Sequence, residues 1–306
     1  MTVGYKGFEK GLVCRDKQYK ENTVFEEPEA RLCETGMHYC TNPLDVLFYY
    51  PIIDGEASPA EYAKVTDLRT SKEKEKEDDW KSSDSKKCTN KIKIGNIIPF
   101  EDYCKLCAID PKFFAIHGVI LLNNFADFYN HSYLIADGSP LIFSFGMTNT
   151  IYNSKGYCYI ATFGNQSRVF NHAGACKLRI ESHRGQIFNK GEHSEILING
   201  NKNLNRNTGY HNMIRFCGND NTFLNNGDIN TIFLDGNNNT IEIKGKFNRI
   251  ICSNTNNNIK LFTNEVLIKA PKGTRIQFID ENLYIEDSDK YYTIMKGKLK
   301  EVEDFD

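Results

Sequence analysis

The chain has 306 residues and a formal net charge of −2, and it contains no run of the roughly 18 apolar residues that a membrane helix requires. A net charge this close to zero excludes a strong overall field for nucleic acid or for an acidic membrane surface. The segment Met1–Lys10 lacks the apolar stretch of a secretion signal. We therefore expect a cytoplasmic protein without a membrane partner, in which the ten cysteines are reduced thiols.

Residues 1–70 predict a small α+β domain. Short strands are indicated at Tyr5–Phe8, Leu12–Arg15 and Ala63–Leu68. Asn42 precedes Pro43, and this pair is typical of a helix start, because asparagine caps free amide groups and proline fits the first helical position. We expect this helix to run through Tyr50.

Residues 71–90 read largely as charges of both signs, with the run SKEKEKEDDWKSSDSKK. Such a segment buries too little to order itself, which predicts a charged flexible loop, with a binding tail as the alternative. Residues 91–132 are expected to bridge the two parts of the protein and to cap the repeats. The pair Cys104 and Cys107 forms a lone CxxC without a partner pair, which favours buried thiols over a metal site.

Residues 133–270 carry a nine-residue period. Of the sixteen positions from Tyr133 to Ile268 taken every ninth residue, fifteen are apolar or aromatic, and the exception is Asn205. Glycine occupies nine of twelve positions on a second nine-residue grid between Gly146 and Gly245. A constant period of this kind is typical of a chain that winds into a solenoid.

The full period is 18 residues, because an asparagine series recurs only in alternate nine-residue halves. Apolar residues at i and i+2 indicate strands, and glycine is expected to supply a left-handed or tight backbone at the corners. We therefore predict a two-sided parallel β-solenoid with 18 residues per coil. The alternate-half asparagines should stack inside as a hydrogen-bonded ladder, rather than lie at corners, and they are Asn153, Asn171, Asn189, Asn207 and Asn225.

A second asparagine series is expected at the corners, where asparagine tolerates left-handed torsions. Its members are Asn212, Asn221, Asn230, Asn239, Asn248 and Asn257. The period ends after Ile268, and residues 271–306 alternate like paired strands, which predicts a C-terminal β cap with turns at Asp287–Asp289 and Lys296–Gly297.

Few motifs carry chemistry. Phosphate-binding glycine loops, a GxSxG elbow and HExxH are absent, and His172, His183, His193 and His211 should face solvent or lie at corners. Calcium-binding nonapeptides need more carboxylates than this solenoid offers. Residues 169–268 contain 11 Lys plus Arg against 8 Asp plus Glu, an excess of 3, which argues against DNA mimicry and against direct nucleic-acid binding. We expect no cofactor and no metal, and we assign no catalytic residue.

The N-terminal runs GYKGF, CRDKQY and LCETGMHYCTNPLDVLFYY resemble a domain of unknown function in phage and prophage proteins, many of which continue into nine-residue repeats. The C-terminal run KYYTIMKGKLKEVE is similar to the closing segment of those proteins. In this chain Asn and Ile replace the small repeat residues of that family. The resemblance implies a phage-type origin and a two-part architecture, but it supplies no activity.

A fainter likeness links the same region to ADP-ribosyltransferases. The run Gly36–Tyr39 resembles their glycine-aromatic strand, and Tyr5–Gly7 falls where their first strand lies. No catalytic glutamate of that family can be placed in this chain. The likeness implies an N-terminal binding site at Lys6, His38, Tyr39 and Tyr50.

These observations favour a non-enzymatic phage-type accessory protein that binds a protein or ribonucleoprotein partner. Its most concrete form is an inhibitor of a host antiviral defence system, such as a CRISPR nuclease. The alternatives are an ADP-ribosyltransferase-like enzyme acting on NAD and a virion structural solenoid that assembles as a trimer.

Overall fold

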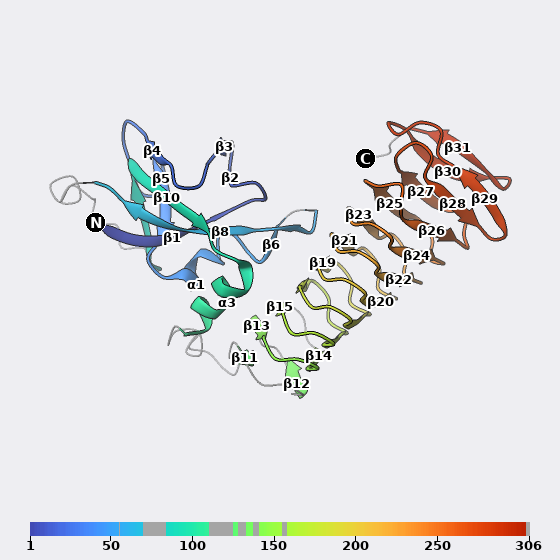
Figure 1. Ribbon diagram of the computed structural model, residues 1–306, viewed down its shortest axis with the longest axis horizontal. Helices are drawn as coiled ribbons and strands as arrows, with labels where there is room; N and C mark the ends of the chain where they lie inside the picture. The colour runs from blue at the N-terminus through green and yellow to red at the C-terminus, as the bar shows by residue number, and fades with distance from the viewer. Residues whose placement is uncertain are drawn as a thin grey trace. The chain divides into compact units, whose positions relative to one another are not determined.

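The computed structural model describes residues 1–54, 56–69, 84–109, 125–127, 133–136, 141–154 and 158–303. The chain divides into two compact units, Met1–Ile116 and His117–Asp306. Both are built mainly from strands, and the second contains the expected two-sided parallel β-solenoid followed by a β cap (Figure 1). Most of the expected charged loop, and residues 110–124 and 128–132 of the expected capping bridge, lie outside the described residues.

In the described part of the first unit, six strands form one antiparallel sheet in the order β4-β10-β8-β1-β5-β9. These strands are β1 (Thr2–Phe8), β4 (Val24–Glu26), β5 (Met37–Cys40), β8 (Glu61–Asp67), β9 (Lys86–Thr89) and β10 (Lys91–Ile97). Two small hairpins pair β2 (Val13–Cys14) with β3 (Lys17–Gln18) and β6 (Ile53–Asp54) with β7 (Ser58–Pro59). The buried core of the sheet is shared by β1, β5, β8 and β10, and β1 with β8 is the long central pair.

Two helices accompany this sheet. Asn42 caps helix α1 (Pro43–Val46) by accepting a hydrogen bond of 2.9 Å from the Leu44 amide, as expected. The helix is shorter than expected: it ends at Val46, and turns continue to Tyr50. On helix α3 (Phe100–Ile109), Tyr103 stacks on Tyr62 of β8 with ring centroids 3.9 Å apart. The thiols of Cys104 and Cys107 are buried on α3, as expected from the lone CxxC.

The boundary expected at residue 70 is wrong. Strand β10, which we expected to open a bridge to the solenoid, instead pairs with β8 and β4 inside the first sheet. Strand β9, expected in the flexible loop, pairs with β5. The sequence did not indicate that these strands belong to the first sheet, because charged residues occur in both. Strand β9 reads KKCT, and only alternate side chains of β10 are buried.

A buried carboxylate joins the strands on both sides of the charged segment. Asp67 at the end of β8 is 0% exposed and forms an ion pair of 2.8 Å with Arg69. Its oxygens also accept hydrogen bonds from the Thr89 hydroxyl at 2.9 Å and the Tyr39 hydroxyl at 3.1 Å. Burial by itself raises the pKa of Asp67, but the hydrogen bonds from Arg69 and Thr89 outweigh burial and hold this pKa below its usual value.

The second unit stacks two parallel sheets, one on each side of the solenoid (Figure 1). In the described residues, one sheet contains β11 (Phe125–Asp127), β13 (Leu141–Ser144), β15 (Tyr159–Thr162), β17 (Lys177–Ile180), β19 (Glu195–Ile198), β21 (Met213–Phe216), β23 (Thr231–Leu234), β25 (Asn248–Cys252) and β27 (Val266–Lys269). The other contains β12 (Tyr133–Ala136), β14 (Thr150–Asn153), β16 (Arg168–Asn171), β18 (Gln186–Asn189), β20 (Leu204–Asn207), β22 (Thr222–Asn225), β24 (Thr240–Ile243), β26 (Asn258–Leu261) and β28 (Arg275–Phe278).

The register confirms the period, because strand residues pair with the residue 18 positions later, as Ile151 does with Val169 and Ile160 with Leu178. The apolar grid from Ile142 to Ile268 points inward and forms one continuous buried cluster. The last coil is one residue shorter, since Ile259 pairs with Ile276. The solenoid therefore extends to Phe278, beyond the expected boundary at residue 270.

The five-asparagine ladder is confirmed. Each side-chain Nδ2 donates to the Oδ1 of the next asparagine, at 2.7 Å from Asn153 to Asn171 and 2.8 Å from Asn207 to Asn225. From Asn171 onward, Nδ2 also donates to the carbonyl two residues later, for example from Asn189 to Gly191 at 3.0 Å. In Asn171, Asn189 and Asn207, both amide protons thus have an acceptor inside the solenoid.

The second asparagine series is a ladder as well, which corrects the expected corner role. Its side chains are buried, and each Oδ1 accepts from the backbone amide 18 residues earlier, as Asn230 does from Asn212 at 2.9 Å. The other distances in this series lie between 2.8 and 2.9 Å. Left-handed torsions belong instead to the residue just before each of these asparagines except Asn257, such as Ile229 (φ 55°) and Phe247 (φ 57°).

The repeat glycines also serve a different purpose from the one expected. None of the described glycines from Gly164 to Gly245 has a positive φ, and after all of them except Gly174 and Gly185 the left-handed residue follows two positions later. At eight of them, a Cβ atom would lie only 1.7 to 2.1 Å from the carbonyl oxygen of the residue 18 positions earlier. Glycine is therefore required because consecutive coils approach closely at this corner.

Asn205, the polar exception in the inward grid, lies between Ile187 and Phe223. Its side chain is 2% exposed, its Oδ1 has no hydrogen-bond partner and its Nδ2 makes one long bond of 3.4 Å to the Thr222 carbonyl. Replacing it with valine, the residue at position 169 of the same column, should raise the free energy of unfolding by about 1–2 kcal/mol, because a poorly paired polar group leaves the core. Urea denaturation measures the change. Asn205→Ala, which leaves a void, should not stabilise, and a destabilised valine variant would contradict this interpretation.

The C-terminal cap closes the solenoid with antiparallel strands. Strand β29 (Glu281–Tyr284) folds back on β28, and β30 (Tyr291–Met295) pairs with β27 and with β31 (Lys298–Val302). Lys296 and Gly297 form the expected turn between β30 and β31, both with positive φ. Because these strands run against the parallel direction, the cap ends the stacking of coils.

Candidate functional site

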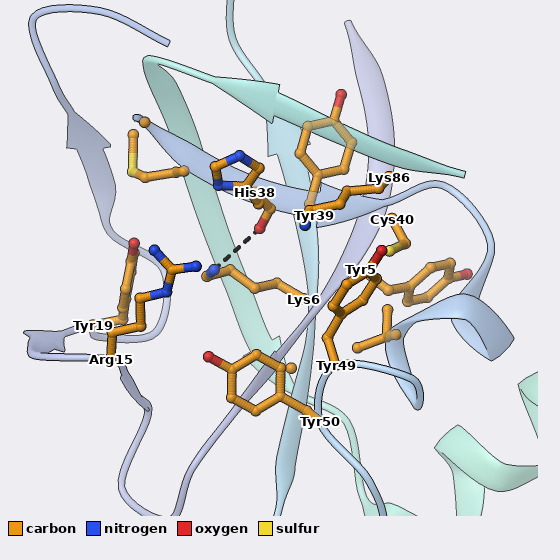
Figure 2. Close-up of a pocket in the computed structure, with 14 residues that line it drawn as sticks. Tyr5, Lys6, Arg15, Tyr19, His38, Tyr39, Cys40, Tyr49, Tyr50 and Lys86 are labelled. Atoms are coloured by element: carbon orange, nitrogen blue, oxygen red, sulfur yellow. Dashed lines mark hydrogen bonds between the residues drawn. The ribbon is translucent and has the colours of Figure 1, made fainter. Parts of the chain in front are cut away.

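A pocket of about 210 Å³ opens in the first unit, between β1, β5, the β2–β3 hairpin and the turn after α1. Figure 2 shows Lys6 at its centre, with His38 on one side and Tyr50 on the other. Tyrosines and cations dominate the lining, which includes Tyr5, Lys6, Arg15, Tyr19, His38, Tyr39, Tyr49, Tyr50 and Lys86.

Lys6 is 4% exposed, which is unusual for a lysine. Its Nζ donates to the His38 carbonyl at 3.0 Å and to the Cys14 sulfur at 3.2 Å. It also lies 5.2 Å from the ring centroid of Tyr19. Burial lowers the pKa of Lys6, and the neighbouring Cys14 opposes this shift only in part.

Glycine positions the aromatic wall beside this lysine. A Cβ at Gly7 would lie 2.5 Å from the Cβ of Tyr50, so only glycine lets the turn after α1 approach β1 so closely. The Tyr50 hydroxyl donates to the Cys14 sulfur at 2.9 Å. Burial and this hydrogen bond raise the pKa of Tyr50, so its proton stays in place at neutral pH.

His38 is an acceptor in this structure. The Cys33 amide donates to its Nε2 at 2.9 Å. Burial, together with the nearby charges of Lys86, Lys6 and Arg15, lowers the pKa of His38 from 6.5 to about 4. The ring is therefore neutral at physiological pH and adds no charge to the pocket.

This shift predicts a dependence of stability on pH. Between pH 6.5 and about 4 the unfolded chain binds a proton at His38 that the folded chain does not, so stability should fall as pH decreases through this window. His38→Gln can still accept from the Cys33 amide but cannot titrate. We expect its thermal midpoint to fall less than that of the wild type between pH 7.5 and 5. Parallel curves for the two proteins would contradict the assignment.

The remaining cations come from two separate segments. Arg15 is exposed in the β2–β3 hairpin, with φ at 53°, and Lys86 at the start of β9 lies 4.3 Å from the ring centroid of Tyr49. Among the described residues that line the pocket there is no aspartate or glutamate. The pocket therefore presents three basic side chains and several tyrosine hydroxyls, a combination that suits an anionic group.

The four residues expected at an N-terminal binding site, Lys6, His38, Tyr39 and Tyr50, all line this pocket. Tyr39 differs from the others, because its hydroxyl hydrogen-bonds to the buried Asp67 and so supports the sheet. Sequence reasoning missed Arg15 and Lys86. Arg15 lies in the CRDKQY run, but no pattern indicated that Lys86 would be placed beside it.

In the described residues of the solenoid, the charged and aromatic side chains form no comparable cluster. His183 Nδ1 accepts from the Asn201 amide at 2.9 Å, and His193 and His211 stack at a corner with ring centroids 5.1 Å apart. A second cavity of about 250 Å³ is lined by Arg206, Glu242 and Lys244 among others, so charges of both signs surround it. In the described ranges, no three His, Cys, Asp or Glu side chains converge as metal ligands would, and no helix is long and apolar enough to cross a membrane.

The fold and the site together define a two-part protein, with a pocket-bearing β domain followed by an asparagine-ladder solenoid. Residues 2–106 match the profile of a family described as a domain of unknown function, DUF7666. The matched segment covers the described part of the first unit almost to the end of α3, and it includes every pocket residue. No curated protein and no solved structure matches the chain significantly.

Proposed function

We propose that this is a non-enzymatic binding protein whose N-terminal pocket receives an anionic group of a protein or ribonucleoprotein partner. One observation carries the proposal: Lys6, Arg15 and Lys86 converge with tyrosines on a pocket whose described lining lacks a carboxylate. Charge-assisted hydrogen bonds from such groups favour carboxylate or phosphate. The solenoid, whose coils are joined by the two asparagine ladders, serves as a rigid scaffold for this domain.

The same geometry argues against catalysis. General acid–base chemistry needs a group that titrates near the working pH and reaches the substrate. The pKa of His38 is about 4, and its Nε2 is occupied by the Cys33 amide. An NAD-acting enzyme nevertheless remains the rival, because tyrosines and cations also suit a nucleotide. If the wild type turned over NAD and His38→Ala did not, the protein would be an enzyme and our proposal would be wrong.

The more specific role, an inhibitor of a host defence system such as a CRISPR nuclease, is supported only by the resemblance of the N-terminal runs to phage proteins. A virion structural solenoid is the other alternative, and the antiparallel cap after Phe278 speaks against end-to-end growth. Light scattering separates these alternatives: a stable trimer would favour the virion role, whereas a monomer would favour an accessory protein.

Affinity capture from host lysate with charge-reversed variants tests the binding site. Wild type and the control Lys20→Glu/Lys93→Glu, altered at exposed lysines outside the pocket, should retain the same partner. Arg15→Glu/Lys86→Glu should bind it about a hundredfold more weakly, because two attractive charges become repulsive. Equal binding by both double variants would show that the partner does not bind at this pocket. Capture of no protein or ribonucleoprotein by the wild type would remove the proposal.

A further inference from the structure

A primary amine and a thiol meet beside the pocket without a known purpose. The Lys6 Nζ and the Cys14 Sγ are 3.2 Å apart, and the Tyr50 hydroxyl reaches the same sulfur at 2.9 Å. Lys6 comes from β1 and Cys14 from β2, which the chain reaches after one short turn. The pair is thus held in contact by the sheet and by Tyr50, rather than by chance on a mobile surface.

The surroundings give each partner a suitable reactivity. Lys6 is almost fully buried, and burial lowers the pKa of its amine, which raises the fraction of Lys6 that carries a free electron pair for attack. Cys14 is only half-buried, so a small oxidant can reach its sulfur. A peroxide converts a thiol into a sulfenic acid, whose sulfur then condenses with a nearby nitrogen.

We propose that Lys6 and Cys14 form a reversible sulfur–nitrogen cross-link when the protein meets hydrogen peroxide. In the first step the thiol takes one oxygen atom from the peroxide, which gives a sulfenic acid and one water. In the second step the Lys6 nitrogen attacks sulfur, the S–O bond breaks, and hydroxide leaves with an amine proton as a second water. The protein loses two hydrogen atoms, and two molecules of an external thiol restore both side chains.

Four other cysteines differ from Cys14 in their exposure or in their contacts. Cys33 is exposed, and its backbone amide donates to His38 Nε2. Burial raises the pKa of the Cys40 thiol to about 12, which leaves it unreactive. Cys158 and Cys176 lie 3.6 Å apart in the solenoid, yet both are at most 2% exposed. Cys33 therefore serves as an accessible reference thiol, and the solenoid pair as a protected one.

The cross-link changes the pocket. Its nitrogen is far less basic than an amine and carries no positive charge, so one of the three cations disappears and the bond to the His38 carbonyl weakens. This consequence rests on the proposed function: oxidised protein should bind its anionic partner about tenfold more weakly, and dithiothreitol should restore binding. Formation of the cross-link can be tested without any partner.

Peptide mapping tests the cross-link on the full-length protein. The protein is treated with hydrogen peroxide, alkylated, digested and analysed by mass spectrometry, with and without dithiothreitol. We expect a linked pair of peptides containing Lys6 and Cys14, with a mass two hydrogen atoms below their sum and a loss on reduction. The linked pair should be absent from protein oxidised in concentrated urea, from Lys6→Arg and from Cys14→Ser.

Three outcomes would overturn the inference. Cys14 could be trapped as a sulfenic acid by dimedone with no linked peptide, or it could pair with another cysteine, or it could stay unmodified while Cys33 is oxidised. The urea control needs no substitution, so the test remains decisive even where Lys6→Arg fails to fold. A linked peptide without any loss of partner binding would retain the cross-link and remove only its regulatory role.

Discussion

Asn189→Asp is expected to destabilise the solenoid by about 4 kcal/mol or more. In the wild type, Asn189 Nδ2 donates to Asn207 Oδ1 at 2.8 Å and to the Gly191 carbonyl at 3.0 Å. A carboxylate has no protons to give, so the Gly191 carbonyl loses this donor and Asn207 Oδ1 keeps only its longer bonds of 3.3 Å from Gly209 N and Asn212 Nδ2. A negative charge then faces both acceptors. Each unsatisfied buried group costs about 1–3 kcal/mol, and an unpaired buried charge adds several more.

Urea denaturation followed by circular dichroism measures this effect. The matched control is Asn226→Asp, the same chemical change at an exposed corner residue, for which we expect a shift within about 0.5 kcal/mol. The defect should lessen as the pH falls, because burial raises the pKa of the new aspartate and the protonated form can donate once more. Equal stabilities for the two variants would show that the ladder contributes little.

The second large effect is expected for Arg69→Met in the first unit. Without the guanidinium, the fully buried Asp67 loses its ion pair and keeps neutral donors, among them the Thr89 and Tyr39 hydroxyls and the backbone amide of residue 69. Removing one member of a buried ion pair typically costs about 3–5 kcal/mol, because the other charge stays buried. The control is Lys91→Met, which removes the exposed ion pair with Glu26 and should cost at most about 1 kcal/mol.

The effect of pH distinguishes the loss of this ion pair from a general packing defect. Because the folded-state pKa of Asp67 lies below its unfolded value of about 3.9, the pair contributes its full stability above that pH. This contribution is lost as the pH falls through the lower, folded-state pKa. The difference in unfolding free energy between wild type and Arg69→Met should therefore shrink below about pH 4. A difference that stays constant with pH would point to lost packing instead.

The solenoid was predictable because its contacts repeat. A residue in one coil meets its counterpart 18 positions later, as Asn171 meets Asn189, so the spacing in the sequence is also the spacing in space. The period did not reveal the structural role of each repeated residue. A glycine needed for close approach and one needed for a left-handed torsion look the same in a sequence, and Gly227 belongs to the first kind.

The first unit was harder to predict because its neighbours are distant in the sequence. Strand β1 lies between β5 and β8, and β9 joins only after the charged segment. Lys6, His38 and Tyr50 could be proposed from a resemblance, and the structure places all three at one pocket. Arg15 and Lys86 depended on strand order, which no local pattern encodes. An interpretation based on the charged run alone assigned Lys86 to a loop.

The 18-residue length of the coils has a consequence for how the gene can change. Deleting residues 190–207 in frame would join Asn189 to Thr208 and place Asn225 directly above Asn189, where Asn207 now lies. Each inward-facing residue would then meet a chemically similar residue in the next coil. Recombination that deletes or duplicates one complete 18-residue coil should therefore still encode a protein that folds as a solenoid. An insertion inside a strand whose length is not a multiple of 18 would shift one sheet against the other, whereas the corners tolerate a difference of one residue, as between Ile259 and Ile276. The height of this protein can therefore evolve in discrete steps of about 4.8 Å.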